Sequence, residues 1–266
     1  MPDADDLVLR DLLASLAEEA GAIALDFQRR GMRTWTKAGA SPVTEADIAV
    51  DRFLKERLGA ARPDFGWLSE ETADNPSRLD RREVFIVDPI DGTRAFAAGL
   101  PDWTISVAAV RDGRPVAAAL AEPVAGRTFI AARGHGASVA GRPLAVKGRE
   151  TIDGAVVAGP KPMTVKVERH GAVALPKIHS LALRFAKVAA SEIDGGFAGG
   201  QSHDWDLAAA DLLVHEAGAS LTGLDGTAPC YNRPVPTHFP LVCAGFPLHE
   251  LLRRAAAEDR RRGVTT

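Results

Sequence analysis

Cysteine is rare in this chain, and Cys230 and Cys243 are the only two among 266 residues. Two cysteines do not form a disulfide framework, and no cluster of cysteine and histidine has the spacing of a zinc site. Cys243 lies in the apolar run Leu241–Ala244, which predicts a buried strand and a reduced thiol. The sequence therefore argues against a disulfide-rich secreted scaffold and against a zinc-centred fold.

Long apolar runs and a strong net charge are absent as well. No segment approaches the length of a membrane span, and the acidic start Met1–Asp6 is not followed by the apolar core of a secretory signal. The net charge is -3 and the pI is near 6.2, which indicates no general attraction to nucleic acid or to an anionic membrane. We expect a cytoplasmic protein with neither a nucleic-acid polymer nor a membrane as partner.

Several familiar catalytic motifs are missing too. There is no G-x-x-x-x-G-K-[ST] segment, and the pairs Gly195-Gly196 and Gly199-Gly200 do not match a Rossmann fingerprint. We expect these glycines to allow close backbone approach near a helix that opens at Asp206. The seven histidines are scattered, and none stands beside a serine or cysteine in a nucleophile-elbow context. Nucleophilic catalysis by a side chain is therefore disfavoured.

Periodicity predicts a mixed α/β chain. Apolar residues at helical spacing predict helices at 9–27, 44–58 and 180–190, a fourth opening near 206 and a fifth from 248 onward. Short apolar runs predict strands at 84–87, 104–110, 116–120, 128–132, 137–139, 193–197, 219–222 and 241–244. Residues 148–178 are rich in Gly, Pro and Lys and weakly periodic. We expect them to join an N-terminal α+β half, residues 1–150, to a smaller α/β half, residues 151–266, packed as one compact unit.

The most informative segment is Asp88-Pro89-Ile90-Asp91-Gly92-Thr93, which follows an apolar run that reads as a buried strand. Two carboxylates three residues apart, with the carbonyl oxygen of Ile90, are the oxygen ligands that a hard cation prefers. Gly92 permits a tight turn, and free N–H groups at the start of the next element can face a phosphate. A strand-end turn with no ligand is the alternative, because Asp and Gly are common in turns.

Acidic residues recur at three other places, each with an alternative structural reading. Thr44 and Asp47 open a helix and also form a capping-box pattern, in which Asp47 would serve only the helix terminus. Glu70-Glu71 follows a short apolar run and could be a solvated acidic turn. Asp206 opens another helix and could be a helix N-terminal acid, with Asp204 as the N-cap.

Together these segments resemble the inositol monophosphatase superfamily of metal-dependent phosphomonoesterases. The segments occur in the family's order and with family-like spacing, at Pro42–Asp47, Ser69–Glu71, Asp88–Thr93 and Trp205–Ala210. The resemblance implies an α/β (α+β) fold, a layered α-β-α-β-α sandwich with the active site between the halves. It also implies a homodimer.

The resemblance also implies a set of roles. Two or three Mg²⁺ ions per site are implied, with metal ligands at Glu70, Asp88, Ile90 (carbonyl), Asp91 and Asp206. Asp47 and Thr93 would hold and polarise the attacking water, with Glu70 counted among the catalytic residues. Asp91, Gly92 and Thr93 would bind the phosphate. Lys37, Glu71 and His203 are candidates for substrate contact or for support of the metal ligands.

The metal-binding motifs specify a phosphate ester but not the alcohol that leaves. Leu68-Ser69-Glu70-Glu71 and Tyr231-Asn232-Arg233-Pro234 resemble the 3'(2'),5'-bisphosphate nucleotidase branch, which favours adenosine 3',5'-bisphosphate as substrate. Inositol 1-phosphate is the alternative, followed by fructose 1,6-bisphosphate. His179-Ser180 stands where the family usually has Gly-Ser. A catalytically inactive phosphate sensor or structural dimer is the non-enzymatic alternative; loss of a metal carboxylate would favour it, and none is lost.

Overall fold

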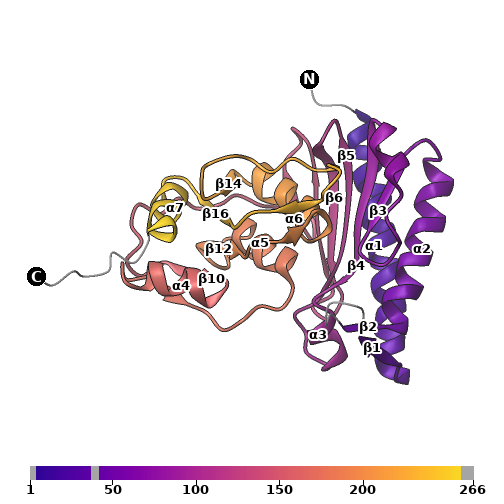
Figure 1. Ribbon diagram of the computed structural model, residues 1–266, viewed down its shortest axis with the longest axis horizontal. Coiled ribbons are helices and arrows are strands. Elements are labelled where there is room, and N and C mark those ends of the chain that lie inside the picture. Colours follow the sequence, from indigo (N-terminus) through magenta and orange to yellow (C-terminus); the bar gives the residue numbers. More distant parts are fainter. Residues whose placement is uncertain (1–3, 37–41, 259–266) are drawn as a thin grey trace, which may run out of the picture.

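The structure, a computed structural model, describes residues 4–36 and 42–258. Two helices, α1 (Ala4–Arg30) and α2 (Glu45–Ala61), cover one face of a sheet (Figure 1). The sheet has seven strands in the order β3-β4-β5-β6-β7-β8-β9, and only the β3–β4 pair is parallel. Its strands are β3 (Gly66–Ser69), β4 (Glu83–Asp91), β5 (Thr104–Arg111), β6 (Arg114–Glu122), β7 (Arg127–Ala132), β8 (Ala137–Val139) and β9 (Arg142–Pro143).

The second half of the chain builds a smaller sheet of five strands in the order β11-β10-β12-β16-β14. The strands are β10 (Val156–Ala158), β11 (Val173–Ala174), β12 (Gly195–Ala198), β14 (Ala219–Gly223) and β16 (Leu241–Gly245). The helices of this half are α4 (Lys161–Glu168), α5 (Leu181–Ala189), α6 (Asp204–Glu216) and α7 (Leu248–Ala257). Shorter elements complete the chain: β1 (Thr34–Thr36), β2 (Pro42–Thr44), a 3-10 turn at Pro76–Asp80, α3 (Thr93–Ala97), β13 (Ser202–His203) and β15 (Thr237–His238).

Strand β4 explains why the large sheet lies between helices. Its residues are buried along almost its whole length, because both faces of the sheet are covered. Phe85 and Val87 pack with α1 and α2 in one core cluster, whereas Val84 and Ile86 pack in another with residues of α5 and α6. Successive side chains of a strand point to opposite faces, so a strand buried on both sides reads as a continuous apolar run.

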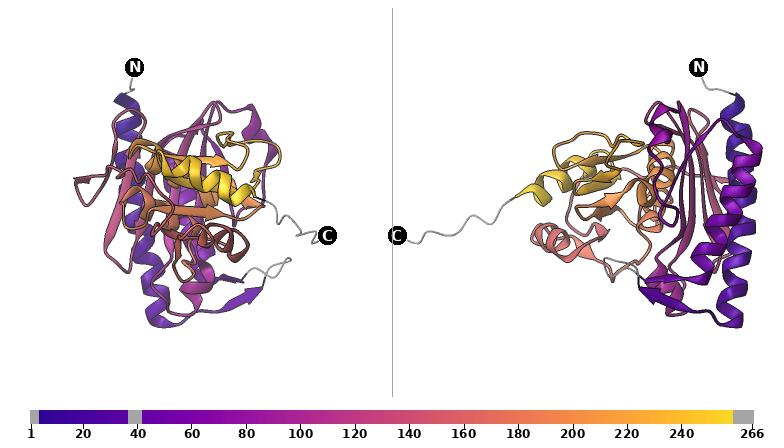
Figure 2. Two further views of the ribbon diagram at one scale, coloured as in Figure 1. Left: turned by 90° about the vertical axis from the view of Figure 1, so that its left-hand side faces the viewer. Right: turned by 45° about the vertical axis from the view of Figure 1, so that its right-hand side comes forward.

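The layers alternate as the sequence predicts. Helices α1 and α2, the seven-stranded sheet, α5 with α6, the five-stranded sheet, and α4 with α7 follow one another across the molecule (Figures 1 and 2). A third apolar cluster joins α4 and α7 to strands of the smaller sheet. The predicted α-β-α-β-α sandwich is therefore confirmed. The larger sheet ends at Pro143 and the smaller begins at Val156, on either side of the expected boundary near 150; the division into halves 1–150 and 151–266 that form one compact unit stays a prediction.

The strand expected near 193–197 is β12, which begins two residues later. Two other expectations about local structure are wrong. Residues 148–178 are not merely a passage, because they contain β10, α4 and β11. Gly195 and Gly196 do not face the helix of Asp206. A Cβ on Gly195 would lie 2.5 Å from Leu252 on α7, and one on Gly196 would lie 3.1 Å from Phe185 on α5.

Candidate metal and phosphate site

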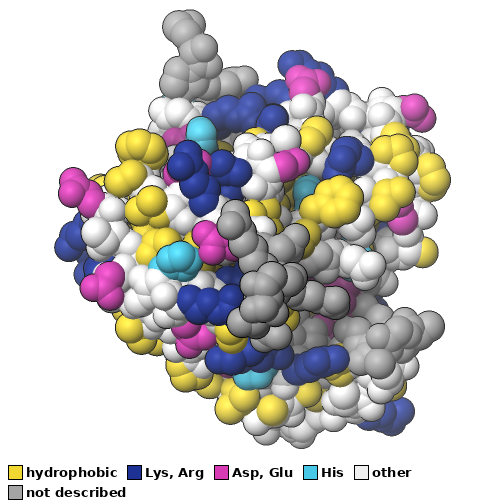
Figure 3. Space-filling view, turned by 60° about the vertical axis from the view of Figure 1, so that its left-hand side comes forward, with side chains coloured by type: hydrophobic (Ala, Val, Ile, Leu, Met, Phe, Trp, Pro, Cys, Tyr) yellow, Lys and Arg dark blue, Asp and Glu magenta, His cyan; other side chains and the backbone are white. Residues whose placement is uncertain are grey.

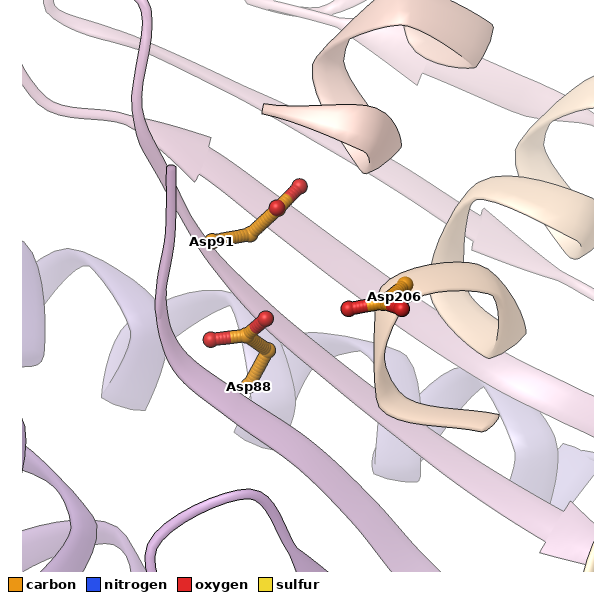
Figure 4. A group of neighbouring side chains, drawn as sticks. All are labelled: Asp88, Asp91 and Asp206. Atoms are coloured by element: carbon orange, nitrogen blue, oxygen red, sulfur yellow. The ribbon is translucent and has the colours of Figure 1, made fainter. Parts of the chain in front are cut away.

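Three carboxylates meet where β4 ends and α6 begins. Asp88 and Asp91 come from β4, and Asp206 lies in the first turn of α6. One oxygen from each lies within 4.8 Å of the others, and Figure 4 shows the three side chains facing a common space. Asp206 is far from Asp88 and Asp91 in the sequence, so the cluster depends on the packing of α6 against the large sheet.

The turn after β4 aims these side chains. The β4–β5 register shifts between Asp88 and Asp91, and the N–H of Ile90 donates to Asp88 Oδ1 at 3.0 Å. Gly92 follows with φ 94° and is the N-cap of α3. A Cβ there would lie 3.0 Å from the carbonyl oxygen of Asp102 and 3.2 Å from the nitrogen of Ser180. Both the left-handed backbone and the close approach require glycine.

Asp91 is held by the start of helix α5. Its Oδ2 accepts hydrogen bonds from Ser180 Oγ at 2.6 Å and from the N–H of Ala182 at 2.7 Å, and its Oδ1 accepts from the N–H of Leu181 at 3.2 Å. Burial raises the pKa of Asp91 by more than these hydrogen bonds lower it, so the net shift is upward. The partial positive charge at the N-terminus of α5 stabilises the charged carboxylate.

Asp88 and Asp206 are held less favourably as anions. Burial raises the pKa of Asp88 well above its usual value, and the neighbouring charges of Glu70, Asp91, Asp206 and Asp47 raise it further. The pKa of Asp206 is likewise raised well above its usual value by burial and by Asp91, although the N–H of His203 donates to its Oδ2 at 2.7 Å. A cation among these oxygens would compensate the repulsion.

The carboxylates lie in a cavity of about 240 Å³. Its described lining residues are Pro42, Glu70, Asp88, Asp91, Gly92, Thr93, Arg94, Lys177, His179 and Asp206. Glu70 lies on this cavity but outside the tightest group of three, so it is not simply a solvated turn residue. A larger cavity of about 470 Å³ lies near Arg114 and Asp211 and has one carboxylate among its lining residues. It offers no comparable oxygen-ligand set.

Thr93 and Asp47 lie beside the carboxylate cluster. Thr93 Oγ1 is 3.0 Å from the carbonyl oxygen of Ile90 and 3.3 Å from Asp47 Oδ1. Asp47 Oδ2 accepts from the N–H of Thr44 at 2.8 Å and from Thr44 Oγ1 at 2.6 Å, and Thr44 caps α2 in a complete capping box. The capping prediction for Asp47 is therefore confirmed, and the same carboxylate still reaches Thr93.

The remaining candidates lie at different distances from the site. Glu71 is half-buried and does not line the cavity; its N–H donates to Ser69 Oγ at 3.3 Å. His203 also does not line it, and stacks on Trp205 with ring centroids 4.4 Å apart. Asp204 is not the N-cap of α6. It is buried, and its carboxylate is 2.7 Å from His238 Nε2 and from the backbone N–H of Asn232. Lys37 lies outside the described residues.

The segment Tyr231–Pro234 has a structural position rather than a place in the cavity. Asn232 Oδ1 accepts from the buried Arg78 at 2.7 Å, and the Tyr231 hydroxyl donates to Asp211 Oδ2 at 3.0 Å. Ser69, in the other segment that resembled the nucleotidase branch, donates to Asp51. These residues support the elements that hold Glu70 and Asp206, and they do not line the cavity.

Sequence reasoning missed His179 and its partner Asp102. The N–H and the Nδ1 of His179 lie 2.6 and 2.7 Å from Asp102 Oδ2, and His179 lines the cavity. Asp102 is far from His179 in sequence and follows no recognised motif. The available signal was the replacement of the family's usual glycine before Ser180.

Comparison with known proteins places this geometry in a family. The model of the inositol monophosphatase family matches residues 8–261. The chain belongs to the inositol monophosphatase family. A histidinol-phosphatase of Mycobacterium tuberculosis is 36% identical, with 84% of this chain and 89% of the relative covered. An inositol-1-monophosphatase of Rhizobium meliloti is 34% identical, with 82% and 86% covered.

Other members extend the comparison. A 3'(2'),5'-bisphosphate nucleotidase CysQ of Aggregatibacter actinomycetemcomitans is 28% identical, with 88% of this chain and 90% of the relative covered. The crystal structure of the suppressor protein suhB from Bartonella henselae superposes with a TM-score of 0.85 at 27% identity, covering 94% of this chain and 99% of that one. The chain is accordingly a phosphatase of the inositol monophosphatase family. Its relatives carry different substrate names, so family membership alone does not select the ester. No described helix combines the length and apolar character needed to span a membrane.

Proposed function

We propose that this phosphatase is an Mg²⁺-dependent phosphomonoesterase with its metal site at Glu70, Asp88, Asp91 and Asp206 and the carbonyl of Ile90. The observation that carries this proposal is the cluster of three carboxylates within 4.8 Å, delivered by β4 and α6. The donors are all oxygen, and burial together with mutual repulsion raises the pKa of Asp88 and Asp206. Both features suit two or three Mg²⁺ ions.

When bound, Mg²⁺ would neutralise the phosphate and lower the pKa of the attacking water. The chain's own part in a direct in-line hydrolysis is to position the reactants. The Thr93 hydroxyl would accept a hydrogen bond from the attacking water and donate its own proton to Asp47. The N–H groups of Gly92 and Thr93 would hold phosphate oxygens, since the first N–H groups of a helix have no intrahelical partner.

For the substrate we propose a 3'(2'),5'-bisphosphate nucleotide such as adenosine 3',5'-bisphosphate. The similarity to the nucleotidase CysQ supports this choice. Inositol 1-phosphate is the second candidate, supported by the relative from Rhizobium meliloti; histidinol phosphate enters through the relative from Mycobacterium tuberculosis, and fructose 1,6-bisphosphate is more distant. We further propose that the enzyme is a cytoplasmic homodimer. Within each chain, the halves 1–150 and 151–266 form one compact unit.

The proposal is tested by phosphate release from these four esters with and without Mg²⁺. We expect activity that requires Mg²⁺ and falls by about 10²–10³ in Asp88→Asn and Asp206→Asn, because each loses a charged ligand at constant volume. Asp64→Asn, a substitution at an exposed position between α2 and β3, is the matched control and should keep the wild-type rate. Full turnover after exhaustive chelation would reject the metal mechanism.

The same assay separates an enzyme from a phosphate sensor that retains the fold. A sensor would bind phosphate in Mg²⁺ buffer but release none from any ester, whereas we expect turnover. Inhibition by lithium is a further expectation, supported by the lithium-soaked inhibitory complex described for a staphylococcal inositol monophosphatase. Turnover that is unchanged in millimolar lithium would count against it.

A further inference from the structure

The cavity that holds the metal carboxylates also has a cationic mouth. Arg94, Lys177 and His179 line it together with the acidic cluster. Asp88 and Asp91 are buried, whereas Arg94 and Lys177 are exposed and His179 is half-buried. Asp88 and Asp91 therefore form the floor of the cavity, and Arg94 and Lys177 lie at its opening. In Figure 3, Lys and Arg side chains gather in the lower part of the view, whereas basic and acidic side chains alternate over the rest of the coloured surface.

His179 is fixed to the turn that carries Asp91 and Gly92. Asp102 Oδ2 accepts from the backbone N–H of His179 at 2.6 Å and lies 2.7 Å from its Nδ1. The carbonyl oxygen of Asp102 accepts from the N–H of Ser180 at 3.2 Å. The same oxygen lies so close to Gly92 that a Cβ there would be only 3.0 Å away. The position of the imidazole is thus coupled to the position of the phosphate-binding turn.

The orientation of the ring leaves one nitrogen for a ligand. Nδ1 is engaged by Asp102, and among the described residues no hydrogen bond is found for Nε2. Asp102 holds the ring through Nδ1, so Nε2 is the nitrogen that remains to meet an anion. Lys177 has no ion pair or hydrogen bond among the described residues, so its ammonium group also remains for a ligand.

We propose that His179, Lys177 and Arg94 form a subsite for a second anionic group of the substrate, a phosphate carried by the alcohol that leaves. This inference rests on the proposed phosphatase function and adds how the substrate is selected. The floor of the cavity already serves the reacting phosphate, so cations at the mouth contribute most when the leaving group is itself negative. An uncharged polyol gains less from them, and a leaving group with an ammonium is repelled.

The experiment compares adenosine 3',5'-bisphosphate with inositol 1-phosphate, whose leaving group is uncharged. His179→Asn keeps an amide near the place of Nδ1 for Asp102 but has nothing at the place of Nε2; His179→Gln places an amide near Nε2 instead. Lys177→Gln removes one charge from the mouth. Lys55→Gln, at an exposed position on α2, makes the same charge change in the outer helical layer.

We expect His179→Asn to lower kcat/KM for the bisphosphate about 10- to 100-fold, mainly through KM, as for loss of a hydrogen bond to a charged group. For inositol 1-phosphate the loss should stay within about threefold. His179→Gln should recover part of the bisphosphate activity, Lys177→Gln should lose about 3- to 30-fold on the bisphosphate, and Lys55→Gln should be unchanged.

Equal losses on both esters in His179→Asn or Lys177→Gln would overturn the subsite, because they would indicate general attraction or misfolding of the turn. So would a wild-type enzyme that hydrolyses inositol 1-phosphate without any preference for the bisphosphate, an outcome that leaves the phosphatase function intact. If no ester is hydrolysed, the phosphatase proposal fails. Calorimetry in the same Mg²⁺ buffer then tests the subsite directly. Binding of adenosine 3',5'-bisphosphate that is no tighter than that of adenosine, or is unchanged in His179→Asn, would reject it.

Discussion

The pair formed by Thr93 and Asp47 offers the sharpest test of how the site works. Thr93 Oγ1 lies 3.3 Å from Asp47 Oδ1 and 3.0 Å from the carbonyl of Ile90, so its single proton has two possible acceptors. Thr93→Val removes the hydroxyl at nearly constant volume, and Thr93→Ser keeps it. If the hydroxyl orients the attacking water, Thr93→Val should lower kcat about 10²–10⁴-fold, the usual range for general acid–base catalysis. Thr93→Ser should remain within about tenfold of wild type.

Asp47→Asn separates catalysis from helix capping. Its oxygen can still accept from Thr44, but an NH₂ group replaces the oxygen that faces Thr93, and the helix loses a favourable charge in its first turn. The lost charge and the weakened cap should cost about 1–2 kcal/mol of unfolding free energy. Relief of the repulsion that Asp47 exerts on Asp88 offsets part of this cost. Capping alone would leave kcat per folded molecule unchanged, whereas a catalytic role should lower it about as much as Thr93→Val.

The assay measures kcat, KM and the melting temperature for both single variants and the double variant in saturating Mg²⁺. We expect the double variant to lose less than the product of the two single losses, because the pair acts as a unit. Wild-type kcat in Thr93→Val would refute the reasoning. A melting-temperature change alone in Asp47→Asn would remove Asp47 from the catalytic residues and leave it as a helix cap.

Three further predictions concern stability. Mg²⁺ should raise the melting temperature of the wild type but much less that of Asp206→Asn, because binding to the folded state alone stabilises it; equal shifts in a thermal scan would place the metal elsewhere. Gly92→Ala should cost at least about 1 kcal/mol through its positive φ and abolish most turnover, and a wild-type melting curve would contradict this. Burial raises the pKa of Asp211 to about 6, so the folded state holds this proton more tightly than the unfolded state. Its stabilising contribution is complete below about pH 4 and lost as pH rises through 6. The free energy of unfolding of Asp211→Asn, relative to that of wild type, should therefore increase by about 3 kcal/mol as the pH rises from 4 to 7. A pH-independent difference in chemical denaturation would refute this.

Local sequence patterns were sufficient to predict much of the fold. The strand–turn–helix at Asp88–Thr93 was predictable because an apolar run buried on both faces ends at Pro89 and Gly92, and the helix of Asp47 because Thr44 and Asp47 form a capping box. Helix α4 was not predictable in the same way. It spans Lys161–Glu168 with Pro in its first turn, which is too short for periodicity to distinguish it from a loop.

Long-range contacts account for what the sequence left open at the site. His179 and Asp102 approach one another only because the start of α5 packs onto the turn after β4, and neither residue has a local pattern that signals a pair. The segment Tyr231–Pro234, which resembles the nucleotidase branch, makes structural contacts with Arg78 and Asp211 and does not line the cavity. A motif that is shared for packing reasons says little about the ester that is hydrolysed.

Under the proposed function, the start of α5 would link recognition of the substrate to the carboxylates on the floor of the cavity. Its free N–H groups and Ser180 hold Asp91, and the preceding residue, His179, is held by Asp102 beside Gly92. A ligand that binds His179 would therefore act on the segment that also orients Asp91, a proposed metal ligand. Binding of the second anionic group would in this way favour the geometry in which Asp91 is correctly placed. This argument separates two results of the His179 variants: a change in KM alone indicates simple affinity, whereas a fall in kcat confined to the bisphosphate indicates that the subsite also positions Asp91.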